Sequence, residues 1–293
     1  MKAMRYFLAL GLACVTAFNA QANSQDTSLD MSYRRVLPLE QGSNFRDAGD
    51  YPTQDGKRVV RGQLFRSAAM YAIDSPSDIA YLNQFNFKTV LDLRSQEERE
   101  LQPDRWVLAD DSINYVAHDY SIMAMLAEAS KAGKSFDMVS FYKMIHMAQL
   151  PQIKLYFDAL LNEQTPIILH CSAGQDRTGF ISAMVLSVLG VDRDIIFEDY
   201  ELSTDLRRPA IEKGDINYVE AAKTNAFAKM MLAYGADKPK TRANPLRTEE
   251  GKPFIEYTFE VLDTEYGSVE GYLKREVGLT DADIAKLRNI YTQ

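Results

Sequence analysis

The segment "IILHCSAGQDRTGF", which runs from Ile167 to Phe180, decides the fold of this chain. It begins with apolar and β-branched residues that are typical of a buried strand, and it leads into a helix, Thr178 to Leu189, that is apolar nearly all round. Between strand and helix lies a loop of small residues that contains Cys171, one of only two cysteines in the sequence. A strand, a short loop and a buried helix in this order predict one unit of an α/β fold.

The same alternation of strand and helix continues upstream of this unit. "KTVLDLRS" (Lys88 to Ser95) and "INYVAH" (Ile113 to His118) indicate two further strands, and the first leads into a capping box that closes on Glu98. Phe136 to Leu150 and Gln152 to Leu161 have the pattern of helices. This order predicts an α/β fold with a mostly parallel central sheet flanked by helices.

The composition favours one folded domain with an acidic surface. The chain has 293 residues, of which 46% are hydrophobic, and this is enough for one large core. From Asp192 onward the pattern is almost wholly helical, so we expect a helical C-terminal part. The formal net charge of −8 opposes binding to nucleic acid, so an anionic substrate needs a local cationic pocket.

The N-terminal segment has the pattern of a cleaved signal peptide. Lys2 and Arg5 precede an apolar run from Tyr6 to Ala17, and Ala20-Gln21-Ala22 then forms a small-x-small cleavage site. The apolar run is too short to span a bilayer. We therefore predict a signal peptide over residues 1–22 that is cleaved after Ala22, no stable membrane anchor, and a periplasmic or secreted protein.

The mature chain is expected to consist of an exposed lead-in, residues 23–40, and a single domain, residues 41–293. With the signal peptide removed, Cys171 is the only cysteine, so no internal disulfide can form. The chain has three histidines, which are His118, His146 and His170. They lack the paired spacing of metal ligands, so we expect no metal ion.

The loop after the strand has the features of a phosphate-binding site. Its backbone N–H groups can point inward as a nest, and the N-terminus of the next helix adds the positive end of its dipole. Gly174 can adopt a positive φ that lets the backbone approach a ligand closely. Arg177 supplies a planar pair of donors for two phosphate oxygens. The predicted phosphate-binding residues are Ser172, Ala173, Gly174, Gln175, Asp176 and Arg177.

The same loop gives Cys171 the surroundings of a nucleophile. A helix N-terminus, inward N–H groups and Arg177 all favour the thiolate form, which can attack phosphorus. Thr178 can donate its hydroxyl to the sulfur, and His170 can orient the loop through a ring N–H. Asp176 is the carboxyl nearest to the chemistry, so it can protonate the leaving oxygen and then deprotonate the attacking water. We therefore predict that Cys171, Arg177 and Asp176 are catalytic.

Five segments together resemble one family. "HCSAGQDRTG" (His170 to Gly179) resembles the His-Cys-x5-Arg-Thr signature loop of the protein tyrosine phosphatase superfamily. Four weaker segments resemble its branch of bacterial tyrosine/lipid phosphatases with an Asn-Phe-Arg-Asp motif, namely "NFRDAG" (Asn44 to Gly49), "LFRSA" (Leu64 to Ala68), "VLDLRS" (Val90 to Ser95) and "YGSVEGYL" (Tyr266 to Leu273). The resemblance covers roughly residues 35–290. It implies a sheet with surrounding helices and a phosphocysteine mechanism that uses no metal ion or cofactor.

The resemblance also assigns roles to single residues. Cys171 matches the nucleophile, Arg177 matches the phosphate-binding arginine, and Asp176 matches the loop aspartate that serves as acid and base in this branch. Asp92 matches an aspartate near the pocket that organises the loop or a water molecule. The sequence has no Trp-Pro-Asp lid, and Asp119 is the alternative acid, although it can equally cap a turn.

One loop position departs from the branch. Gln175 stands where the branch often has a lysine, whose charge favours phosphoinositides that carry several phosphates. The departure weakens the case for inositol lipids. Two sets of basic residues could compensate or could simply be solvated surface, namely Arg207 with Arg208, and Lys238 with Lys240 and Arg242.

These observations favour an exported phosphatase that acts on phosphotyrosine and more loosely on other phosphomonoesters. The alternative enzymes are a phosphoinositide phosphatase and a rhodanese-like sulfurtransferase, which would carry a persulfide on Cys171. A phospho-binding module without turnover is disfavoured because Cys171, Asp176 and Arg177 occur together. The expected partner is a phosphotyrosine protein or a small phosphomonoester, without nucleic acid, and the sequence leaves the oligomeric state open.

Overall fold

A five-stranded sheet forms the centre of the computed structural model, which describes residues 34–124, 137–237 and 242–293. The strands are β1 Arg46–Asp47, β2 Leu64–Ser67, β3 Thr89–Asp92, β4 Asn114–Ala117 and β5 Ile167–His170. Their order across the sheet is β1-β2-β5-β3-β4, in which β1 runs antiparallel to β2 and the other neighbours are parallel. The predicted α/β fold with a mostly parallel sheet is confirmed.

Helices surround this sheet. In the first half of the chain they are α1 Pro76–Leu82, η1 Asn83–Phe85, α2 Gln96–Leu101, α3 Arg105–Leu108, α5 Met138–Ala148 and α6 Leu150–Leu161. In the second half they are α7 Asp176–Val188, α8 Arg193–Glu201, α9 Ser203–Leu206, α10 Pro209–Lys213, α11 Tyr218–Ala221, α12 Ala226–Ala233, α13 Phe254–Tyr266, α14 Val269–Tyr272, η2 Leu273–Val277 and α15 Asp281–Tyr291. The predicted helical C-terminal part is confirmed. Within the described ranges, no helix combines the length and the apolar character needed to cross a membrane.

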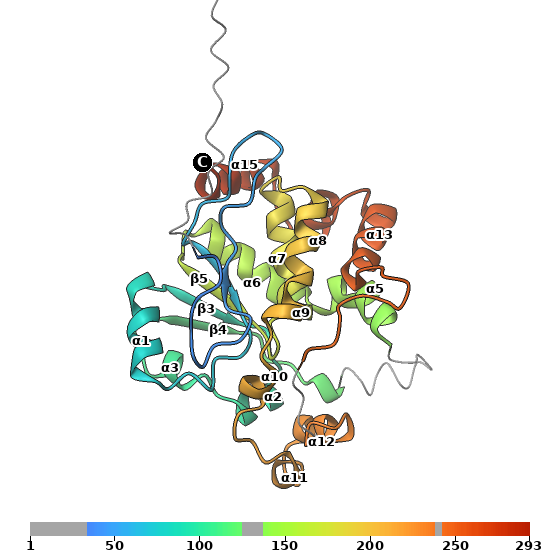
Figure 1. Cartoon of the computed structure of the whole chain (residues 1–293). Helices are drawn as coiled ribbons and strands as arrows, with labels where there is room; N and C mark the ends of the chain where they lie inside the picture. Colours follow the sequence, from blue (N-terminus) through green and yellow to red (C-terminus); the bar gives the residue numbers. More distant parts are fainter. Residues whose placement is uncertain (1–33, 125–136, 238–241) are drawn as a thin grey trace, which may run out of the picture. The chain divides into compact units, whose positions relative to one another are not determined.

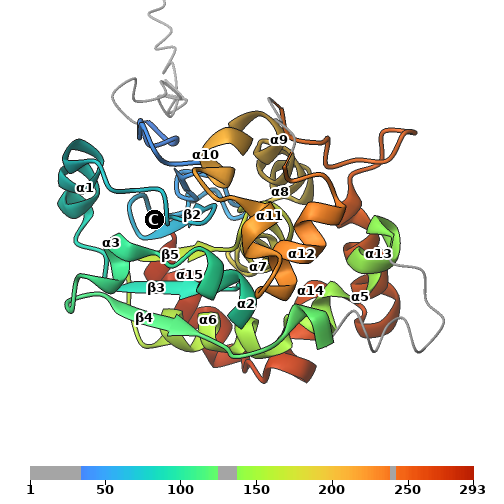
Figure 2. The same ribbon diagram turned by 90° about the horizontal axis from the view of Figure 1, so that it is seen from below.

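Helices cover both faces of the sheet. Because side chains alternate along a strand, Ile167 and Leu169 of β5 enter one core cluster and Ile168 enters another. The first cluster packs against α5 to α8 and α13 to α15, and the second packs against α1 and α3. Figure 1 shows α1 and α3 on one side of the sheet and α6 and α7 on the other, and Figure 2 shows the same layers from below.

The parallel strands all end at one edge of the sheet, where loops from several strands meet. Ala69 N–H, after β2, donates to the Ser172 carbonyl at 3.2 Å, and Leu93 N–H, after β3, donates to the His170 carbonyl at 2.9 Å. Figure 1 shows α10, α11 and α12 beyond the same edge, near α2. The carboxyl edge of a parallel sheet is the usual place for a ligand site in such folds.

The start of the domain differs from the prediction. Residues 23–40 are predicted to be exposed, but Leu37 and Leu39 are buried in the core cluster that also contains α1. Val36 forms a bridge with Arg46, so this stretch continues the sheet beyond β1. Two apolar side chains spaced by two residues face the same side of an extended segment, which explains their burial. Residues 23–33 of the lead-in and the predicted signal peptide lie outside the described residues.

Candidate active site

The signature loop, residues 171–175, connects β5 to α7, which begins at Asp176, two residues earlier than predicted. Gly174 adopts the left-handed region with a φ of +66°, as the sequence predicted. A Cβ atom at this position would lie 2.4 Å from the Ser67 carbonyl oxygen. Only glycine therefore fits where the loop crosses the end of β2.

The carbonyl groups of the loop are held from outside. The Asn44 side-chain amide donates to the carbonyls of Ala173 (3.1 Å) and Gly174 (2.9 Å), and Arg66 Nη2 donates to that of Gly174 (2.9 Å). In a trans peptide the N–H points away from the carbonyl, so the N–H groups of Gly174 and Gln175 point away from these partners. No hydrogen-bond partner for these two N–H groups occurs among the described residues. They are therefore available to an anion inside the loop.

A buried ion-pair network supports the loop from below and gives two of the family segments a physical role. Arg46 Nε and Arg66 Nη1 donate to opposite oxygens of Asp199, at 3.0 Å and 2.6 Å, and the Tyr51 hydroxyl adds a third bond at 2.8 Å. Burial by itself raises the pKa of Asp199, but the two guanidinium groups hold it well below its ordinary value. The charged Asp199 therefore ties α8 to β1 and β2 and, through Arg66, to the loop.

Arg177 is fixed by a residue that the sequence pattern identified only as a helix cap. Its Nη1 and Nη2 atoms each donate to Glu98 at 2.7 Å, and Nη1 also donates to the Tyr120 hydroxyl at 2.8 Å. Glu98 is 0% exposed and also accepts the Ser95 N–H, in the predicted capping box, and the Ser172 hydroxyl. One carboxylate thus orients both Arg177 and Ser172 of the signature loop.

The Glu98–Arg177 pair leaves part of the guanidinium available. Burial by itself raises the pKa of Glu98, but Arg177 and the hydrogen bonds to the carboxylate lower it below its ordinary value. The Nε–H of Arg177 has no hydrogen-bond partner among the described residues, and Nη2 uses one of its two N–H groups. One edge of the guanidinium is therefore anchored on Glu98, and the other can bind two oxygens of an anion.

Cys171 is buried at the start of the loop as a free thiol. Arg177 and Arg207 both interact electrostatically with it. Thr178, in the first turn of α7, has a buried hydroxyl that finds no hydrogen-bond partner within the described part of the chain. A buried hydroxyl without a partner is costly, so its retention beside the loop suggests a use in the reaction.

Asp176 is held by two side chains. The Tyr142 hydroxyl of α5 donates to Asp176 Oδ1 at 2.6 Å, and Gln175 Nε2 donates to Oδ2 at 3.0 Å. Tyr142 is fully buried and in turn accepts a hydrogen bond from the Tyr200 hydroxyl of α8 at 2.7 Å. The local sequence did not indicate these tyrosines, because they come from helices 34 and 24 residues away in the chain.

The alternative acid, Asp119, lies elsewhere. Its side chain is 70% exposed and pairs with Arg99 on the surface of α2. The neighbouring residue, Tyr120, is the one that reaches the loop, where its hydroxyl contacts Arg177 and donates to the Leu93 carbonyl at 2.8 Å. The structure therefore places Asp176, and not Asp119, beside Arg177 in the loop.

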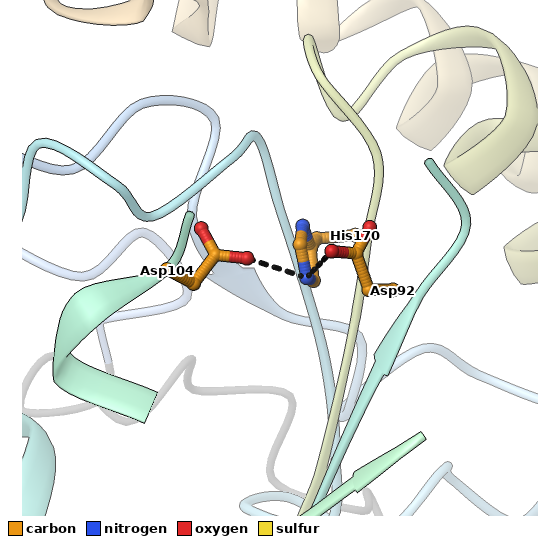
Figure 3. Close-up of side chains that lie close together, drawn as sticks. All are labelled: Asp92, Asp104 and His170. Carbon is orange, nitrogen blue, oxygen red and sulfur yellow. Dashed lines mark ion pairs between the residues drawn. The ribbon is translucent and has the colours of Figure 1, made fainter. Parts of the chain in front are cut away.

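His170 and Asp92 belong to a second buried network. Figure 3 shows the His170 ring between two carboxylates, with Nε2 3.3 Å from Asp104 and 3.7 Å from Asp92. Asp92 also accepts hydrogen bonds from Arg94 Nε at 2.9 Å and from the Tyr115 hydroxyl at 2.7 Å. Asp92 is fully buried and lies beside His170, the residue before the loop, so of its two predicted roles the burial favours organising the loop over holding a pocket water.

The spacing of this second network would suit a cation, since Asp92, Asp104 and His170 offer ligand atoms within 4.8 Å of one another. Arg94, however, donates to both carboxylates and supplies the compensating charge. Burial opposes the ionisation of Asp92, but Arg94 and His170 hold its pKa below the ordinary value, whereas burial raises the pKa of Asp104. The group is therefore best described as an ion-pair network that joins β3 and β5.

Of the basic residues considered for compensation of Gln175, Arg207 reaches the loop. Its Nη1 donates to Gln175 Oε1 at 2.5 Å, and its other donors bind the Glu212 carboxylate at 2.6 Å to 3.2 Å. Arg208 instead donates to the Gly42 carbonyl at 3.0 Å, which is a structural contact. The position beside Gln175 therefore carries a positive charge that is already paired with Glu212.

A pocket of about 660 Å³ opens beside the loop at Ser172 and Ala173. Its remaining wall is largely apolar and includes Pro209, Ala210, Tyr218, Phe227, Met231 and Tyr234 from α10 to α12 and the turn that follows. The polar and charged residues of the lining are Gln102, Arg207, Glu212 and Lys213. The second basic set adds no visible charge to this wall, because Arg242 is not part of the lining and Lys238 and Lys240 lie outside the described residues.

The fold and the site together define a phosphatase of the His-Cys-x5-Arg class, with an anion cradle at the carboxyl edge of a mostly parallel sheet. The model of the tyrosine phosphatase family matches residues 37–293, and the chain belongs to this family of protein-tyrosine phosphatases.

Relatives extend over most of the chain. It is 27% identical to the triple specificity protein phosphatase PtpB of Mycobacterium tuberculosis, over 87% of this chain and 98% of that protein. It is 26% identical to a tyrosine-protein phosphatase of Nostoc commune, over 69% of this chain and 65% of that protein. Among solved structures, the core catalytic domain of the PP-IP phosphatase SIW14 from S. cerevisiae is 15% identical, with a TM-score of 0.33, over 70% of this chain and 99% of that chain.

Proposed function

We propose that this protein is an exported phosphatase that hydrolyses phosphotyrosine through a phosphocysteine intermediate on Cys171. The observation that carries the proposal is the loop itself, which brings together Cys171, inward N–H groups and the Arg177 guanidinium, held by Glu98, at one edge of the sheet. The pattern of residues 1–22 supports export.

Substrate binding uses the donors that the protein leaves unpaired. The outward edge of Arg177 binds two oxygens of the phosphoryl group, and the N–H groups of Gly174 and Gln175 bind the oxygens that remain. The N-terminus of α7 adds its positive dipole end to the same place. These donors stay in position as charge moves onto the phosphoryl oxygens, so they stabilise the transition state without reorganising.

The first chemical step transfers the phosphoryl group to the protein. The Cys171 thiolate attacks phosphorus, an S–P bond forms, and the bond between phosphorus and the phenolic oxygen breaks. Asp176 gives its proton to that oxygen, so tyrosine leaves as a neutral phenol.

The second step returns the protein to its starting state. Asp176, now charged, takes a proton from a water molecule whose oxygen attacks phosphorus, and the S–P bond breaks. The sulfur leaves as a thiolate, and the unpaired hydroxyl of Thr178 is positioned in the first turn of α7 to donate to it. Inorganic phosphate is released, and no electron or cofactor is consumed.

The pocket beside the loop supports an aryl phosphate as the substrate. Its apolar wall suits a phenyl ring, whereas an inositol ring with several phosphates needs additional cations. Of the two cations in the pocket lining, Arg207 is already paired with Glu212, and Lys213 donates to the Asp237 carbonyl at 3.2 Å. A sulfurtransferase has no support, because the family match concerns phosphatases.

A substrate panel tests the proposal. The purified protein should release phosphate from a phosphotyrosine peptide with a higher kcat/KM than from an alkyl phosphate or a short-chain phosphoinositide. Cys171→Ser should abolish turnover, since a serine hydroxyl stays protonated near neutral pH. Substantial turnover by Cys171→Ser would overturn the phosphocysteine route, and a higher kcat/KM on the phosphoinositide would move the substrate class to inositol lipids.

A further inference from the structure

Asp176 must both give and take a proton in the proposed reaction, so the groups around its carboxyl decide how it works. Inside the protein, Oδ1 accepts the Tyr142 hydroxyl at 2.6 Å, and the oxygen of Tyr142 accepts the Tyr200 hydroxyl at 2.7 Å. Both rings are buried and pack edge to face, nearly perpendicular to each other, with centroids 6.0 Å apart. The two tyrosines and Asp176 therefore form one directed chain of hydrogen bonds that runs from α8 through α5 to α7.

The direction of this chain depends on both tyrosines staying protonated. Burial, followed by the charge of Asp176, raises the pKa of Tyr142 and of Tyr200 well above the ordinary value. Each hydroxyl therefore has a proton to donate across the whole range in which the protein can be assayed. A hydroxyl that donates to a carboxylate stabilises the charged form of that carboxylate over the protonated form.

The other groups that face Asp176 come from two places. Within the loop, Gln175 donates to Oδ2 at 3.0 Å, and this amide is held by Arg207, which also interacts electrostatically with Asp176 and with Cys171. Arg207 is already neutralised by Glu212, at 2.6 Å. The Tyr142 hydroxyl is thus the buried donor that acts on Asp176 from outside the loop.

We propose that Tyr142 is a positioning residue for the acid–base step: its hydroxyl, held in turn by Tyr200, fixes the rotamer of Asp176 and supplies a hydrogen bond to its carboxylate when Asp176 activates water. This inference rests on the proposed function, since it gives Asp176 the two proton transfers described above. The charged form is the one required for hydrolysis of the phosphocysteine, whereas transfer to the leaving group needs the protonated form. The chain of tyrosines therefore supports Asp176 in the step that needs the carboxylate.

The test is the pH dependence of kcat/KM and kcat for a phosphotyrosine peptide. Tyr142→Phe removes the donor to the carboxylate, so the charged form of Asp176 loses a stabilising hydrogen bond. The limb of each profile that reports Asp176 should move upward by about one pH unit, which is the size expected for loss of one hydrogen bond to a charged group. At a pH below the shifted limb, hydrolysis of the phosphocysteine should slow and the phosphorylated protein should accumulate.

Two further variants keep the test decisive. Tyr200→Phe leaves the contact with Asp176 intact and removes only the outer link, so it should shift the same limb in the same direction by a smaller amount. Tyr291→Phe is the matched control, because Tyr291 is also buried and its hydroxyl donates to the Leu160 carbonyl, at 2.8 Å, and not to the loop. It should lose some stability and leave both profiles unchanged.

The inference is overturned if Tyr142→Phe and Tyr200→Phe, folded by circular dichroism, give the same pH limbs as Tyr291→Phe. It is also overturned if either shifts the limb downward. If Tyr142→Phe does not fold, Tyr200→Phe alone decides between these outcomes. Failure of the proposed function is separate, because it would appear as turnover by Cys171→Ser whatever the tyrosine variants do.

Discussion

Replacement of Glu98 by glutamine tests how the protein holds Arg177, the arginine that we propose binds phosphate. Glutamine keeps the shape of the side chain and removes its charge. At present both carboxylate oxygens accept a bond of 2.7 Å from Arg177, and the Ser172 hydroxyl shares one of them. In Glu98→Gln an NH₂ group must face one of these donors, so a buried hydrogen bond is lost together with the ion pair.

The expected cost follows from burial. Breaking a fully buried ion pair by removing one partner costs about 3–5 kcal/mol. Glu98 is 0% exposed, but the Arg177 side chain is 14% exposed and recovers some hydration. We therefore expect the free energy of unfolding to fall by about 3 kcal/mol, at the lower end of that range. Because the Arg177 guanidinium is then less firmly oriented, KM for a phosphotyrosine peptide should also rise by about tenfold, the equivalent of one charge-assisted hydrogen bond.

Urea unfolding of Glu98→Gln beside Asp263→Asn provides the measurement. Asp263 and Arg193 form a pair of the same two-pronged geometry, at 2.8 Å and 3.0 Å, but their side chains are 41% and 48% exposed. The control should lose less than about 1 kcal/mol and keep its KM. Equal losses of stability in the two variants would show that burial does not govern the Glu98 pair, and an unchanged KM in Glu98→Gln would refute its role in orienting Arg177.

Three further predictions concern pH, the acid and export. Because their neighbours hold the pKa values of Glu98 and Asp199 below those of the unfolded chain, both carboxylates stabilise the fold above about pH 4–4.5 and lose that effect as the pH falls. Urea midpoints should therefore drop on acidification, and drop less in Glu98→Gln; a steeper drop in that variant contradicts the assignment. Asp176→Asn should slow hydrolysis of an alkyl phosphate about 10²–10⁴-fold more than hydrolysis of a nitrophenyl phosphate. Asp119→Asn should change both rates little. The reverse pattern in the two variants would move the acid to Asp119. Mass spectrometry of the exported protein should find Asn23 at the N-terminus; retained Met1, or a lipid on Cys14, would contradict cleavage after Ala22.

Local patterns in the sequence were sufficient to predict the centre of the fold. The apolar runs at β3 and β5 are flanked by a capping box and by a helix of continuous apolar character, and these signals need no distant partner. The positive φ of Gly174 also follows from the loop chemistry, and the structure adds the reason, which is the backbone of Ser67 at 2.4 Å.

The support of the site could not be predicted in the same way. Asp199 meets Arg46 and Arg66 across 153 and 133 residues of chain, and Tyr142 meets Asp176 across 34, so neither pairing leaves a periodic signal. Glu98 was visible only as the end of a capping box. Its second role arises because β3 and β5 are neighbours in the sheet, which brings their following loops together.

The central claim is that the phosphoryl group passes through Cys171, and trapping that intermediate tests it most directly. Asp176→Asn should bind a nitrophenyl phosphate, transfer its phosphoryl group and then hydrolyse the product slowly. Rapid denaturation followed by peptide mass spectrometry should locate one phosphoryl group on the peptide that contains Cys171, and Cys171→Ser should yield none. Turnover with no phosphorylated Cys171 at any time, or a phosphoryl group on another residue of the wild-type protein, would contradict the account.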